Sequence, residues 1–156
     1  MTDTDATSGW VTEFVRDHPD AAVATLRADG STHVARVELA AVGDRIQSTG
    51  APSLVRTRNI RRDPRCSLFV FGPYPRWLGL DAEARILDGT DAPELLVRLL
   101  KARHGDRTPP GMVLGHDEAT GGDRLFPERD YLDRVRRDQL FVFDFRILRS
   151  YGNPHA

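Results

Sequence analysis

Hydrophobic and polar residues alternate along several short segments of the chain, which is the pattern of half-buried β-strands. The pattern predicts strands at 21–26, 32–41, 45–49, 66–71, 77–87 and 139–148. Asp29-Gly30 and Gly43-Asp44 separate the first three segments, and such pairs are typical of tight turns between antiparallel strands. Because short strands at this spacing are typical of a barrel, we expect a mainly β fold.

A second periodicity, with apolar residues three and four positions apart, predicts helices between these strands. The expected helices run from residue 10 to 17, from about 53 to 62, from 92 to 104 and from 128 to 137. Residues 105–127 have little periodicity, and the first 18 of them contain five glycines and two prolines. We therefore expect a single domain over residues 1–156 with a loop insertion at 105–127.

Composition excludes several classes of protein. The chain has 156 residues with 22 basic and 23 acidic side chains, so its net charge of −1 does not suit a polycation that binds nucleic acid. Cys66 is the only cysteine, which excludes an intramolecular disulfide and a multi-cysteine metal site. No apolar run has the length of a membrane span, and residues 1–9 lack the plan of a signal peptide. These features favour a cytoplasmic protein without membrane contact.

Positive charge is concentrated in one segment, although the net charge of the whole chain is close to zero. Residues 55–65 contain five arginines and one aspartate, and they open a predicted helix just after Ser48 and Thr49 at a strand end. A helix N-terminus presents free N–H groups and a partial positive charge, so hydroxyls and arginines beside it are typical of a phosphate site. Arg56 falls in the first turn, where an anion would bind. The alternative is a solvated helix face carrying Arg58, Arg61 and Arg62.

The order of these motifs resembles a known family. The strand and turn at 24–30, the Arg-x-Arg-Asn-Ile-x-x-Asp-Pro-Arg segment at 56–65, and Trp77 together resemble the pyridoxamine 5′-phosphate oxidase-like split β-barrel family. The similarity covers about 10–90 and 138–154 and is closest to the branch that uses the deazaflavin coenzyme F420. The resemblance implies a six-stranded antiparallel split β-barrel and a homodimer, with F420 or, alternatively, FMN bound at the dimer interface.

The resemblance also implies the residues that bind the cofactor. Carried over position by position, these are His33, Arg36, Ser48, Thr49, Leu54, Val55, Arg56 and Trp77. Arg56 takes the place of the phosphate-binding residue, the two hydroxyls lie near the phosphate, and Trp77 is an aromatic wall in its own or the partner's site. Leu54 stands where the deazaflavin branch often has a basic residue, and Ala84 stands where a strand glycine is usual. Residues 105–127 match no part of the family pattern.

Two functions of different classes agree with this pattern. The first is an oxidoreductase that transfers a hydride between the deazaflavin, or FMN, and an unsaturated small molecule, with His33 or Arg36 stabilising or protonating the developing anion. The second is a protein that binds the flavin or deazaflavin without turnover. Nucleic-acid binding is disfavoured because no aromatic residues are interleaved with the arginines. The catalytic residues remain unassigned.

No metal is expected. Candidate ligands occur at the end of the helix expected at 92–104 and in the segment that follows it, and their irregular spacing favours solvated polar residues. These candidates are His104, Asp106, His116, Asp117 and Glu118. Cys66 opens an apolar strand and is interpreted as a small core residue.

Overall fold

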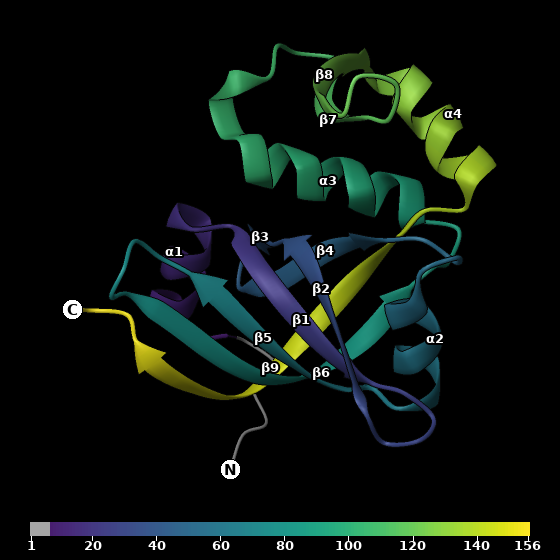
Figure 1. Cartoon of the computed structure of the whole chain (residues 1–156). Helices are drawn as coiled ribbons and strands as arrows, with labels where there is room; N and C mark the ends of the chain where they lie inside the picture. Colours follow the sequence, from purple (N-terminus) through teal and green to yellow (C-terminus); the bar gives the residue numbers. More distant parts are fainter. Residues whose placement is uncertain (1–6) are drawn as a thin grey trace.

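The computed structural model describes residues 7–156, apart from the side chain of residue 106, and consists of a curled antiparallel sheet with a smaller lobe above it (Figure 1). The helices are α1 (Gly9–Asp17), α2 (Val55–Arg62), α3 (Ala92–His104) and α4 (Glu128–Asp138), with a 3₁₀ turn at Gly105–Arg107. The strands are β1 (Asp20–Leu26), β2 (Thr32–Glu38), β3 (Ala40–Val42), β4 (Arg45–Gly50), β5 (Arg65–Phe71), β6 (Trp77–Leu87), β7 (Met112–Asp117), β8 (Gly122–Pro127) and β9 (Phe141–Asn153).

The main sheet has the split-barrel form that the sequence predicts, with seven strands in the order β2-β1-β5-β6-β9-β4-β3. The count differs from the expected six because the chain between 32 and 42 breaks into two strands at Leu39. The amide of Leu39 leaves the ladder and donates to the carbonyl of Pro19 at 2.7 Å. This break turns the chain from one end of the sheet to the other, so that β2 and β3 become the two end strands.

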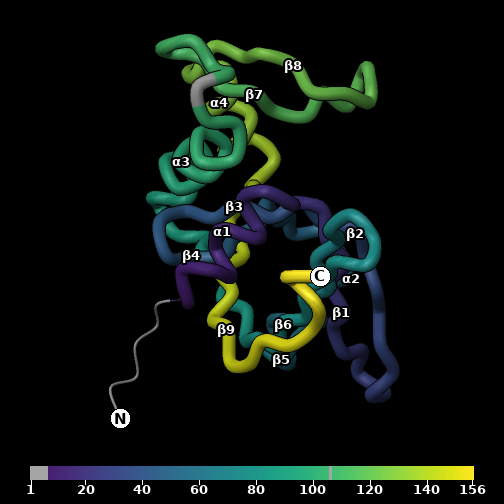
Figure 2. Tube along the Cα trace, turned by 90° about the vertical axis from the view of Figure 1, so that its left-hand side faces the viewer, coloured from purple at the N-terminus to yellow at the C-terminus, as the bar shows by residue number. Residues whose placement is uncertain are grey.

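Figure 2 shows the main sheet curling round on itself. Its interior is a continuous apolar core. Alternate residues of each strand point inward, as Leu78, Leu80, Ala82 and Ala84 do along β6, and all four are buried. Cys66 is buried in the same core, as expected, and desolvation raises the pKa of its thiol to about 12. The thiol is therefore a packing group at neutral pH.

Helix α3, the β7–β8 hairpin and α4 form the lobe, which has its own apolar cluster. The cluster joins the lobe to the outer face of the barrel through Ala40 on β3 and Val142 on β9. Here the expectation of a loop at 105–127 is wrong, because most of this segment is the two-stranded antiparallel hairpin β7–β8. The side chains of Val113 and Phe126 pack into the lobe cluster and stabilise the hairpin, a contact between distant residues that local periodicity does not report.

No helix in residues 7–156 combines the length and the hydropathy needed to cross a membrane. Residues 1–6, which form most of the segment examined for a signal peptide, lie outside the described part of the chain.

A buried carboxylate joins three strands beneath the lobe. Asp144 on β9 is 1% exposed and accepts hydrogen bonds from Arg45 and Gln47 on β4 and from Arg85 on β6. Although burial opposes ionisation, these donors keep the pKa of Asp144 below its usual value of 3.8. The carboxylate therefore fixes β4 and β6 on either side of β9.

We expect Asp144→Asn to lower the free energy of unfolding by about 3 kcal/mol, because it removes a buried negative charge that Arg45 and Arg85 both contact. Urea titration of the two proteins measures this difference. The pKa of Asp144 is lower in the folded protein than its usual value of 3.8 in the unfolded chain, so its ionised form stabilises the fold. The difference in unfolding free energy between the parent and Asp144→Asn should therefore be complete above pH 3.8. It should shrink as the pH falls below that value and the carboxyl becomes protonated.

Glu128→Gln is the matched control, because Glu128 forms an exposed ion pair with Lys101 at 3.0 Å. Exposed pairs contribute roughly 0–1 kcal/mol, so this variant should unfold almost as the parent does. Equal losses in the two variants would contradict the role given to Asp144.

Candidate functional site

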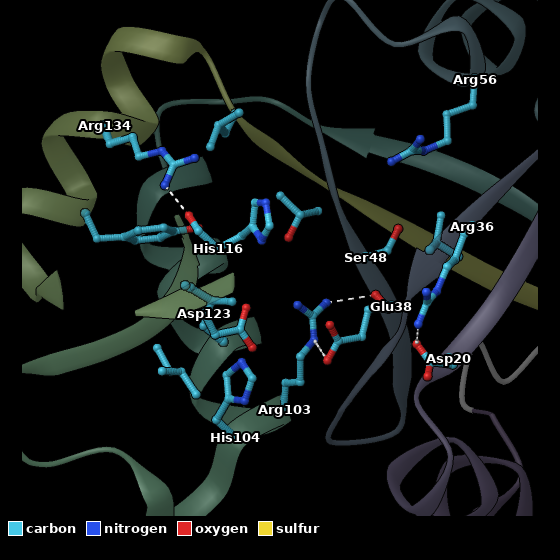
Figure 3. Close-up of a pocket in the computed structure, with 17 residues that line it drawn as sticks. Asp20, Arg36, Glu38, Ser48, Arg56, Arg103, His104, His116, Asp123 and Arg134 are labelled. Atoms are coloured by element: carbon cyan, nitrogen blue, oxygen red, sulfur yellow. Dashed lines mark hydrogen bonds and ion pairs between the residues drawn. The ribbon is translucent and has the colours of Figure 1, made fainter. Parts of the chain in front are cut away.

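A cavity of about 530 Å³ lies between the barrel and the lobe. Its barrel wall is formed by Asp20, Arg36, Val37, Glu38, Ser48, Thr49 and Arg56. Its lobe wall is formed by Leu100, Arg103, His104, Leu114, Gly115, His116, Asp123, Tyr131, Arg134 and Leu140. Figure 3 shows the labelled side chains of the two walls facing each other across the open space. The volume suits a bound small molecule.

Two buried polar atoms on the barrel wall lack hydrogen-bond partners. The hydroxyl of Ser48, on β4, belongs to a residue that is 2% exposed, and the buried Nε of Arg56, on α2, is likewise without a partner. Arg56 forms no ion pair among the described residues, and its guanidinium lies 5.8 Å from the ring of Phe143. Burial therefore lowers the pKa of Arg56. An anion bound here would supply the missing counter-charge and hydrogen-bond acceptors.

The N-terminus of α2 adds to this site. Leu54 is its N-cap and supplies no side-chain hydrogen bond, so the first amides of the helix, at Val55 and Arg56, find no acceptor within the described residues. Free amides and the helix dipole favour an anion at this position. Of these groups, Ser48 and Arg56 line the cavity and suit a phosphate group, whereas Val55 lies outside the lining.

The other arginines of the 55–65 segment have different roles. Arg62 donates to the carbonyl of Leu26 at 2.6 Å, and Asn59 donates to the hydroxyl of Thr25 at 3.0 Å, so both hold α2 against β1. Arg61 pairs with Asp88 at 3.1 Å. Of the three arginines expected on a solvated flank, Arg61 and Arg62 thus make defined contacts. The motif combines one cavity residue with several that position the helix.

The structure brings together only part of the predicted set. Arg36, Ser48, Thr49 and Arg56 line one cavity, and Arg36 also pairs with Asp20 at its rim. The side chains of His33, Leu54, Val55 and Trp77 lie outside this lining. His33 is at the start of β2, opposite Thr25, whereas the cavity meets the end of the strand; its buried Nδ1 has no hydrogen-bond partner.

Trp77 lies on the outer face of the barrel. Its ring stacks on that of Phe69 at 5.1 Å and meets Tyr151 edge-on at 6.1 Å. In this chain Trp77 is therefore no part of the cavity's wall, and its proposed contact with a cofactor depends on a second subunit.

Sequence reasoning missed the lobe wall. His104 and His116 were interpreted as solvated residues, but both line the cavity and His104 is 7% exposed. His104 is the last residue of α3, a helix with a buried face. Its position in that last turn was the one feature of the sequence that could have indicated a histidine in the cavity wall. Within the described residues no three metal-ligating side chains gather to hold a metal ion; the side chain of Asp106 lies outside that description.

Comparison with known proteins agrees with this architecture. Residues 10–131 match the family model described as Pyridoxamine 5′-phosphate oxidase. Among curated proteins, no sequence matches the chain.

Solved structures share the fold at low sequence identity. The conserved hypothetical protein Rv2991 from Mycobacterium tuberculosis has a TM-score of 0.65 and 18% identity, with 96% of this chain and 87% of that one covered. A protein named F420 Reductase has a TM-score of 0.58 and 19% identity, with 89% and 94% covered. HutZ, the heme storage protein of Vibrio cholerae, has a TM-score of 0.60 and 15% identity, with 94% of each chain covered.

The unpartnered charge of Arg56 generates a stability prediction. We expect Arg56→Met to leave the melting temperature of the ligand-free protein unchanged or higher, because it removes a desolvated cation without a counter-charge. Added inorganic phosphate should raise the melting temperature of the parent protein but not of this variant. Differential scanning fluorimetry with and without phosphate measures both effects.

Arg58→Met is the control, because Arg58 is on the same helix but is exposed. This variant should keep the response to phosphate. A phosphate response that survives in Arg56→Met would place the anion elsewhere.

Proposed function

The chain belongs to the pyridoxamine 5′-phosphate oxidase family, and from this membership we propose that it is an oxidoreductase that uses the deazaflavin coenzyme F420. Its substrate would be an unsaturated small molecule. The observation that carries the proposal is the pair of buried, unpartnered polar atoms on Ser48 of β4 and on Arg56 in the first turn of α2. The likeness to a protein named F420 Reductase supports the fold on which this chemistry occurs.

The residues of the barrel wall fit the phosphate that F420 and FMN share. Arg56, the Ser48 hydroxyl and the first amides of α2 would hold this group, with Thr49 beside them. When bound, the coenzyme supplies the hydride, so the protein needs only to bind it, orient the substrate and exclude water. The lobe helps with the last task, because it covers the side of the cavity opposite the barrel.

FMN is the second candidate for the same position. Leu54, where the deazaflavin branch often has a basic residue, packs against the barrel core as the N-cap of α2. It therefore adds no cation for an anionic coenzyme tail. If the protein is not an enzyme, its alternative function is to bind FMN in this position without catalysing a reaction.

Titration of the purified protein with F420 and, separately, with FMN tests the proposal by coenzyme fluorescence. We expect F420 to bind, and Arg56→Ala to weaken binding about 10- to 100-fold, because the variant removes a charge-assisted hydrogen bond worth roughly 1.5–3 kcal/mol. Preference for FMN would move the protein to the flavin branch. Failure to bind either coenzyme would refute the proposal.

We also propose that the protein is a homodimer. Phe69, Phe71, Trp77 and Tyr151 form an aromatic patch on the outer face of β5, β6 and β9, and Phe71 is 52% exposed. The Tyr151 ring packs directly over Gly79, where a Cβ atom would approach it to 2.3 Å. Exposed contiguous apolar surface of this kind favours association with a second copy. Residues 140–145 add nothing to this patch, because the barrel core and the lobe bury Phe141, Val142, Phe143 and Phe145.

Phe71→Glu should shift the protein from dimer to monomer, because it places a charge within the aromatic patch. Sedimentation equilibrium at micromolar concentration measures the change. Val34→Glu is the comparison, since Val34 is 63% exposed on β2 but is not among the residues of the patch. A parent protein that sediments as a monomer would refute the dimer.

A further inference from the structure

We infer that His104 is a pH sensor of the lobe, and that protonation of its ring in mildly acidic solution releases the turn at Gly105–Arg107 and opens this end of the cavity. His104 lines the cavity, although the residue is only 7% exposed. Histidine is the residue whose charge changes most readily near neutral pH, and its surroundings decide at which pH this happens. The inference goes beyond the proposed function and requires no coenzyme.

Arg107 contacts His104 at two atoms, and one of these contacts requires a ring nitrogen without a proton. The Nη2 of Arg107 lies 3.2 Å from Nδ1 of the imidazole, and its Nε donates to the backbone carbonyl of His104 at 3.4 Å. A guanidinium group only donates hydrogen bonds, so Nδ1 must be the acceptor, and a charged imidazolium ring has no acceptor nitrogen. Protonation of Nδ1 therefore sets two donors against each other and ends this contact.

The groups around the ring favour its neutral form. Burial has the largest effect and, together with the positive charges of Arg103 and Arg107, lowers the pKa of His104 below 6.5. Glu38 on β2 and Asp123 on β8 act in the opposite direction, as does the partial negative charge at the C-terminal end of α3. The other ionisable groups that line the cavity are Tyr131 and Arg134 on α4, His116 on β7, and Asp20, Arg36 and Arg56 on the barrel wall.

The end of α3 also joins the lobe to the barrel, so a charge on His104 affects the cavity wall. The side chain of Arg103 is 10% exposed, and its Nη2 donates to the backbone carbonyl of Glu38 at 2.8 Å (Figure 3). A protonated His104 would be a second cation at this junction, next to Arg103 and Arg107, in a place where little water screens the charges. The ring relieves this repulsion by moving out of the wall into solvent.

The coupling between proton binding and opening has a definite sign. The pKa of His104 is lower in the closed form than the usual value of 6.5, so the closed form binds the proton more weakly than a form with an exposed ring. Lowering the pH below 6.5 therefore shifts the population towards the open form, by up to about 10-fold for each pH unit because one proton is involved. Above pH 6.5 the closed form has its full stability.

Nuclear magnetic resonance of the full-length protein tests the sensor. We expect the ring of His104 to titrate with a pKa below 6.5, and Arg107→Ala to raise that pKa, because the variant removes a neighbouring cation. A soluble nitroxide should broaden the His104 signal more once the ring is protonated than at pH 7.5. The exposed His155 is the internal reference and should be broadened equally in both conditions. A His104 pKa at or above 6.5, or a protonated ring that stays shielded from the nitroxide, would overturn the inference.

Hydrogen exchange tests whether the charge opens the end of the helix. Protection factors compare the observed exchange with that of an unstructured chain at the same pH, so they report structural opening alone. They should fall about 10-fold between pH 7.5 and 5.5 for the amides of residues 103–105, and stay constant for Leu80 in the barrel core. In His104→Gln this fall should disappear, because the side-chain amide accepts from Arg107 at both pH values and takes up no proton.

A second substitution and a folding measurement complete the test. His155→Gln makes the same change at an exposed histidine that packs on Trp10, and it should keep the pH response of the parent. Thermal unfolding at pH 7.5 verifies that His104→Gln folds, and the titration of His104 in the parent needs no variant. Constant protection in the parent, or an equal fall in His104→Gln, would refute the inference, whatever the coenzyme titrations show.

Discussion

The structure depends on how one buried carboxylate holds neighbouring strands together. Asp144 fixes β4 against β9 through Arg45 and Gln47, and fixes β6 through Arg85. Gln47 directly precedes Ser48, so the interaction that sets the position of β4 also sets the serine that faces the cavity. The lobe packs on the same region through Val142, two residues before Asp144. Stability and the geometry of the site therefore have a common physical origin.

The cavity is asymmetric in its chemistry. Its barrel wall carries a desolvated arginine without a counter-charge, a serine hydroxyl without a partner and a free helix end, all of which favour an anion. Its lobe wall carries the imidazole of His104, which contacts Arg107, and an arginine already paired with Glu38. The two walls of the cavity therefore offer a ligand different chemical groups.

The lobe adds a second wall to the cavity beside the split barrel. Val113 and Phe126 pack its hairpin into a second apolar cluster, so that the hairpin and α4 stand beside the barrel as a fixed wall. The aromatic patch around Trp77 lies on the outer face of the barrel, and none of its four residues is among those that line the cavity.

Much of the barrel was predictable because its strands obey local rules. Alternation along β6 and the turns at Asp29-Gly30 and Gly43-Asp44 depend on neighbouring residues. The helix expected at about 53–62 is α2, and its Arg56 lines the cavity. The sequence also sufficed for the family, since its motifs occur in a fixed order. The hairpin at 105–127, the break at Leu39 and the burial of His104 were decided only by tertiary structure. Each depends on contacts between residues far apart in the chain, and neither periodicity nor composition records which distant side chain will cover, pair with or desolvate a given residue.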